Sequence, residues 1–76
     1  PIRDNYVGND MNVLINGENR EVPDSVDLKA LLELFSMPSQ RVAVELNRSV
    51  VRKADWETVT VSEGDRIEVI HFVGGG

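Results

Sequence analysis

Apolar and polar residues alternate regularly from Met11 onward. Apolar side chains recur at every second position over 11–15, the period of a strand with one buried face. Asn16-Gly17 follows, and both residues tolerate the positive φ values of a type I′ turn. The pattern therefore predicts a β-hairpin, with a returning strand over 20–22 that Pro23 ends.

The period then changes to that of a helix. Asp27 is a suitable N-cap, and Pro38 prevents the helix from continuing past Met37. Lys29 and Glu33 lie four residues apart and are expected to pair on the polar side. The positions i, i+3, i+4 and i+7 form one apolar face: Leu28, Leu31, Leu32 and Phe35.

Strand periodicity returns in the second half of the chain. Residues 41–46 alternate, and a polar turn over 47–49 leads to a short strand at 50–51. Residues 53–56 are expected to form a single helical turn whose tryptophan lies at the edge of the core. The last strand, 67–72, has apolar residues on both faces, as is typical of a central strand covered on both sides.

These elements predict an α+β domain. One apolar helix face is buried most compactly by a mixed sheet of four to five strands packed on that main helix, a β-grasp (ubiquitin-like) roll. The domain is expected over 11–73. Residues 1–10 lack periodicity and are interpreted as a non-native remnant or disordered leader, and 74–76 as a flexible glycine tail.

Composition excludes several classes of function. The chain has 76 residues, a formal net charge of −5 and no cysteine, so thiol nucleophiles, disulfides and thiolate metal sites are excluded. The acidic balance argues against nucleic-acid binding. No apolar run approaches the roughly 20 residues of a membrane span, so no membrane contact is expected and a cytoplasmic location is the default.

The side chains offer little chemistry of their own. His71 is the single histidine, and no metal site or autonomous active site is expected. If the chain end is native, the carboxylate of Gly76 is the remaining reactive group, and Gly74 and Gly75 leave its approach open. A carboxylate is a poor acyl donor until a partner activates it, with ATP adenylation as the obvious route. The alternative is that the three glycines are a passive end or a truncated linker.

Several segments together resemble one known family. Met11-Asn-Val-Leu-Ile-Asn-Gly17, the leucine-rich helix, Val42-Ala-Val-Glu-Leu-Asn47, Val51-Arg52 leading to Trp56, and the ending His71-Phe-Val-Gly-Gly-Gly76 are similar to the ThiS sulfur carriers of thiamine biosynthesis. The resemblance covers residues 11–76. It supports regarding the first ten residues as foreign.

The resemblance implies a mechanism and a set of partners. An E1-like adenylyltransferase of the ThiF type would adenylate Gly76 with ATP and magnesium, while the chain itself binds no cofactor. Sulfur from a cysteine desulfurase or another donor would convert the carboxylate to a thiocarboxylate. A thiazole synthase of the ThiG type would then take the sulfur, so the chain would be a protein co-substrate rather than an enzyme.

Other functions share the same features. The small subunit of molybdopterin synthase (MoaD-like) has the same roll and a Gly-Gly end, but its tail usually follows a proline-rich segment rather than His71-Phe72-Val73. Sulfur carriers for tRNA thiolation or cysteine synthesis, a ubiquitin-like modifier and a passive interaction module also remain. For any partner, the expected contact is the exposed sheet face near the last strand, and the candidate contact residues are His71, Phe72, Arg48 and Arg52.

Overall fold

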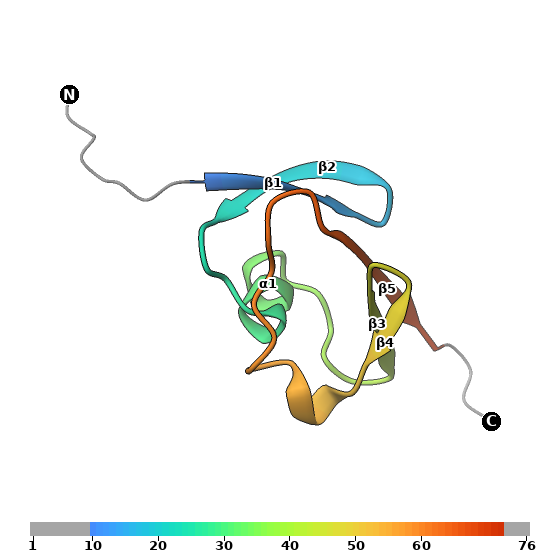
Figure 1. Cartoon of the computed structure of the whole chain (residues 1–76). Helices are drawn as coiled ribbons and strands as arrows, with labels where there is room; N and C mark the ends of the chain where they lie inside the picture. The colour runs from blue at the N-terminus through green and yellow to red at the C-terminus, as the bar shows by residue number, and fades with distance from the viewer. Residues whose placement is uncertain (1–9, 73–76) are drawn as a thin grey trace.

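The computed structural model describes residues 10–72, which form a five-stranded sheet and one α-helix (Figure 1). The strand order is β2-β1-β5-β3-β4. The expected leader, apart from Asp10, and the glycine tail lie outside the described residues. The elements are β1 Asp10–Ile15, β2 Glu18–Pro23, α1 Leu28–Leu34, β3 Val42–Leu46, β4 Ser49–Val51, the 3₁₀ helix η2 Lys53–Asp55 and β5 Arg66–His71.

The first hairpin forms as predicted. β1 and β2 are antiparallel, with Asp10 opposite Pro23 and Ile15 opposite Glu18. Asn16 and Gly17 make the two-residue turn at φ values of 51° and 84°. β1 begins one residue earlier than expected, so Asp10 belongs to the sheet and not to the leader.

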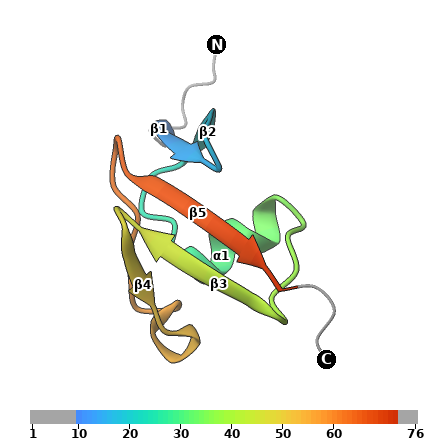
Figure 2. The same ribbon diagram turned by 90° about the vertical axis from the view of Figure 1, so that its right-hand side faces the viewer.

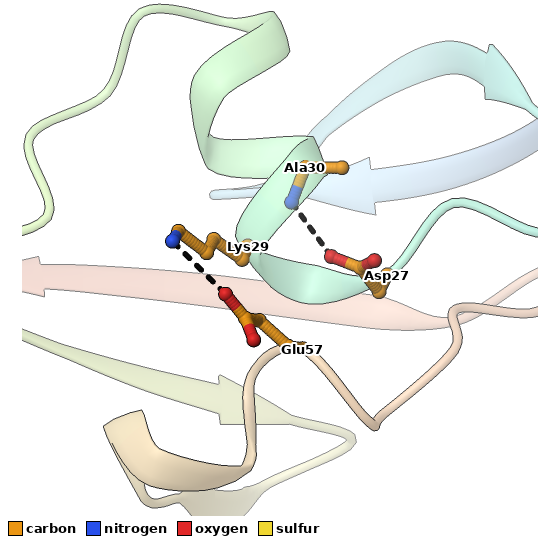
Figure 3. Close-up of polar contacts among 4 residues, drawn as sticks. All are labelled: Asp27, Lys29, Ala30 and Glu57. Carbon is orange, nitrogen blue, oxygen red and sulfur yellow. Dashed lines mark hydrogen bonds and ion pairs between the residues drawn. The ribbon is translucent and has the colours of Figure 1, made fainter.

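The helix begins at its predicted cap. An oxygen of the Asp27 carboxylate accepts a hydrogen bond from the Ala30 backbone N–H at 2.8 Å (Figure 3). The predicted apolar face is confirmed, because Leu28, Leu31 and Leu32 are fully buried and Phe35 is half-buried at the C-cap. α1 ends at Leu34, well before the proline expected to stop it.

The expected pair between Lys29 and Glu33 was wrong. The Lys29 ammonium instead donates to Glu57, which follows η2, at 3.0 Å (Figure 3). This hydrogen bond is the main reason the pKa of Lys29 is raised, and the charges of Glu57 and Glu33 add to it. Because the pKa is raised, the pair is complete at neutral pH and is lost only in strongly alkaline solution. Both side chains are exposed, so the pair contributes little stability.

β5 is the central strand of the sheet (Figure 2). It pairs with β1 in parallel, through Leu14↔Arg66 and Ile15↔Ile67, and with β3 antiparallel along five residue pairs. Where β1 ends, the side-chain oxygen of Asn16 accepts from the Val69 N–H at 2.8 Å. The turn residue therefore continues the pairing of β5 beyond the last parallel residue pair.

Only one face of the sheet is covered by α1, which lies behind β5 and β3 in Figure 2. The buried residues on the helix side form one core, which Trp56 joins: Met11, Val13, Ile15, Val22, Leu28, Leu31, Leu32, Val44, Trp56, Val61 and Ile67. On the other face of β5, Ile70 is 43% exposed and Phe72, just after the strand, is 55% exposed. The expectation of a central strand covered on both sides was wrong, because one short helix covers a single face.

Trp56 follows the predicted single helical turn. Its ring is buried, and its indole N–H donates to the Val51 carbonyl at 2.9 Å. The ring therefore packs inside the core, and its bond holds the segment after β4 against the sheet. In the described part of the chain, no helix is long and apolar enough to cross a membrane.

The N-cap provides a direct test of the fold. Replacing Asp27 with alanine leaves the Ala30 N–H without its side-chain acceptor, and we expect a loss of about 1 kcal/mol in the free energy of unfolding. For a domain of this size that lowers the thermal midpoint by roughly 4–8 °C. Asp27→Asn keeps an acceptor and is the control; an equal loss in both variants would contradict the role of the cap.

Candidate functional site

The end of β5 is the point from which the chain continues toward its C-terminus. The Phe72 N–H donates to the Arg41 carbonyl at 2.8 Å, so the backbone pairing with the β3 side extends one residue beyond the strand. Phe72 is the last described residue. Gly74, Gly75 and Gly76 lie outside the described residues, and their role stays a prediction.

The sheet face turned away from α1, called the outer face below, carries exposed apolar side chains beside this point. Directly opposed residues on antiparallel strands share a face, so Ile70 of β5 lies beside Ala43 of β3. Phe72 follows Ile70 on the same side, because side chains alternate along an extended chain. Val50 of the edge strand β4 is 66% exposed and lies opposite Glu45. Ile70 and Phe72 therefore form an exposed apolar patch where the chain leaves the sheet, and Val50 lies apart from this patch, beside Glu45.

The structure separates the four residues predicted to contact a partner. Phe72 lies on the outer face, whereas His71, opposite Val42, is directed to the other side of β5 and is also exposed. Arg48 lies in the turn between β3 and β4, at the far end of the sheet. Arg52 follows β4, and its guanidinium lies 3.7 Å from the Asp55 carboxylate.

Sequence reasoning missed Ile70 and Val50 as surface residues. Both were assigned to strands, but the pattern alone did not show which apolar face would remain uncovered. The uncovered face could have been predicted from the number of helices, because the apolar stripe of one helix can bury only one face of a sheet. Ile67 and Val69 occupy that face, so Ile70 had to be on the other.

The described residues hold no constellation typical of an enzyme's metal centre. No group of three or more His, Asp or Glu side chains that could bind a metal ion occurs within residues 10–72. The polar side chains of the turns are used in folding: Asp65 accepts from the Ser62 N–H at 2.7 Å and from the Asn47 amide at 3.0 Å.

Comparison with known proteins decides the family. The model of the ThiS family matches residues 13–76. The chain belongs to the ThiS family. The fold agrees: the crystal structure of the thiamine biosynthesis protein ThiS from Geobacter metallireducens superposes with a TM-score of 0.77 at 33% identity, covering 87% of this chain and all of that one. The predicted β-grasp roll and the predicted family are both confirmed.

Two kinds of protein are similar in sequence to this ThiS-family chain. The sulfur carrier protein ThiS of Bacillus subtilis is 34% identical over 53 residues, covering 70% of this chain and 80% of that protein. The thiazole synthase of Paramagnetospirillum magneticum is 41% identical over 66 residues, which is 87% of this chain but 20% of the synthase. The thiazole synthase of Magnetococcus marinus matches in the same proportions at 38% identity. This chain thus spans about a fifth of these two synthases.

Because the outer face is exposed, substitutions of the two isoleucines of β5 are expected to change the free energy of unfolding by different amounts. Ile70→Thr keeps a β-branched side chain on an exposed position, so we expect the free energy of unfolding to change by no more than about 0.5 kcal/mol. Ile67→Ala leaves a cavity in the core and should cost about 2–5 kcal/mol. Urea unfolding measures both. A comparable loss in Ile70→Thr would show that the outer face is covered.

Proposed function

We propose that this chain is a sulfur carrier of thiamine biosynthesis whose cargo is bound at the carboxylate of Gly76. The observation that carries the proposal is the ThiS-family match, which extends from residue 13 through Gly76. The fold supports it, because the exposed apolar part of the outer face lies where β5 leads to the tail. The chain is then a co-substrate that partner enzymes modify.

The chemistry of a carboxylate defines the steps. A carboxylate oxygen attacks the α-phosphorus of ATP, pyrophosphate leaves, and an acyl adenylate forms at Gly76. The terminal sulfur of a persulfide on a cysteine desulfurase or another donor then attacks the acyl carbon as AMP leaves, which gives an acyl disulfide. A second thiol cleaves the S–S bond, which releases the thiocarboxylate of Gly76 and leaves that thiol in a disulfide with the donor cysteine. ATP and magnesium belong to an E1-like activating enzyme of the ThiF type. The glycines matter because side chains near the reacting carbon would obstruct its approach.

The activating enzyme must hold the folded domain while the tail reaches its active site. We assign this contact to the outer face around Ile70 and Phe72, because the buried centre of a protein interface is enriched in apolar and aromatic side chains, and a few such residues carry most of the binding energy. A thiazole synthase is the expected acceptor of the sulfur. The two thiazole synthases that match this chain over a fifth of their length support such a pairing.

Intact mass spectrometry tests the cargo. After incubation with a ThiF-type enzyme, ATP and a sulfur donor, we expect the mass to rise by the difference between one sulfur and one oxygen atom. A variant without Gly75 and Gly76 should keep the fold and show no such increase. An unchanged mass of the full chain, with an activating enzyme that is active on its own carrier, would overturn the proposal.

The docking surface has a matched test. Ile70→Thr removes apolar contact area from the outer face, and we expect it to weaken binding to the activating enzyme by at least about fivefold, the effect of roughly 1 kcal/mol. Leu34→Gln is the control, because Leu34 is 51% exposed but belongs to α1, on the other side of the sheet. Isothermal titration calorimetry measures both affinities. Equal affinities for the two variants would place the contact elsewhere.

A further inference from the structure

The turn between β3 and β4 has a residue that its geometry does not favour. Asn47 and Arg48 are the two central residues of this hairpin, with φ values of 52° and 74°. The hairpin between β1 and β2 has similar φ values with Asn16-Gly17, the residues that such turns favour. A left-handed backbone strains a residue with a β-carbon, whereas glycine adopts it freely. Within residues 10–72, six non-glycine residues have a positive φ, and Arg48 is the one that occupies the usual glycine position of a two-residue hairpin turn.

Arg48 lies beside a second arginine. Together with Leu14, Asn47 and Gly64, Arg48 and Arg66 line an open notch of about 290 Å³. The Asn47 backbone N–H donates to the Arg66 carbonyl at 2.7 Å, and the Asn47 side-chain oxygen accepts from the Arg66 N–H at 2.9 Å. These two bonds fix the backbones of the arginines relative to each other. The notch is therefore held by the hairpin and β5 before any ligand arrives.

The positive charges of the notch are not paired within the described domain. Neither Arg48 nor Arg66 forms an ion pair with a carboxylate of residues 10–72. The two acidic side chains of the adjacent turn already accept hydrogen bonds: Asp65 from Ser62 and Asn47, and Glu63 from the Asn12 N–H at 3.0 Å. The two guanidinium groups thus keep free donors for a ligand.

We propose that Arg48 and Arg66 bind a carboxylate side chain of the activating enzyme and so fix the orientation in which the carrier docks. The inference rests on the proposed function. Guanidinium groups suit the planar, two-oxygen geometry of a carboxylate. The notch is separated from Phe72 by the length of β5, about 20 Å of extended chain. Two contacts this far apart, one apolar near Phe72 and one ionic at the notch, would fix the direction in which β5 lies on the enzyme.

The charges between the two contacts make the orientation specific. Glu68 of β5 and Glu45 of β3 are direct neighbours on the outer face, between the notch and Ile70. They repel a partner carboxylate from the middle of the face, while the notch attracts it. A reversed carrier would place the partner's carboxylate beside apolar side chains and leave the arginines unpaired. The tail would then point away from the active site of the activating enzyme.

The test uses the full chain, a ThiF-type activating enzyme and two measurements. Arg48→Gly should raise the thermal midpoint of the free carrier by roughly 4–8 °C, because glycine adopts the left-handed turn conformation without strain. The same variant should weaken binding to the enzyme about tenfold and reduce the salt dependence of the affinity. Arg66→Gln should weaken binding to a similar extent. Arg20→Gln is the charge-matched control, because Arg20 pairs with Glu18 away from the notch, and its affinity should stay within about twofold of wild type.

The outcomes separate this inference from the proposed function. If the wild-type chain neither binds the activating enzyme nor gains sulfur, the sulfur-carrier proposal fails. If the wild-type chain does both, and Arg48→Gly and Arg66→Gln bind as Arg20→Gln does, the notch has no role in docking and the inference is overturned. Weaker binding of a more stable Arg48→Gly carrier supports it, since loss of folding cannot explain that result.

Discussion

One short helix must cover a five-stranded sheet, and this constraint shapes the molecule. The seven residues of α1 bury three leucines against one face, and within residues 10–72 no helix packs on the other. The side chains of the central strand therefore lie in two environments: Ile67 is buried in the core, and Ile70 is exposed on the outer face. The same division lets the surface of the domain be used for binding without disturbing the interior, since the exposed residues contribute little to folding.

The central strand connects folding to the proposed function. β5 is paired on both sides at its start, and Asn16 and Arg41 extend its hydrogen bonding at Val69 and Phe72. A chain end that leaves a firmly held strand starts from a defined position, which reduces the entropy lost when a partner captures it. In the proposed sulfur carrier, β5 therefore fixes the point from which the chain continues toward Gly76.

Much of this fold could be predicted from the sequence because local rules dominate it. Asn16-Gly17 and the Asp27 cap are local signals, and both lie where they were expected. The errors come from contacts between distant segments: Lys29 pairs with Glu57, 28 residues away, and the outer face of β5 stays uncovered. The second hairpin turn was predicted only as a polar turn, because arginine follows Asn47 where glycine is the usual signal. Arg48 lies near Arg66 because β3 is the neighbour of β5 in the sheet, and the alternation of apolar residues along the chain does not predict the order of the strands.

The central claim is that the outer face docks the activating enzyme while the tail carries the sulfur. Hydrogen–deuterium exchange of the carrier, free and bound to that enzyme, tests it most directly, because backbone amides covered by a partner exchange more slowly. The account predicts slower exchange in β3, β5 and the turn between β3 and β4, with α1 unchanged. Protection confined to α1 and the segment around Glu57 would contradict it.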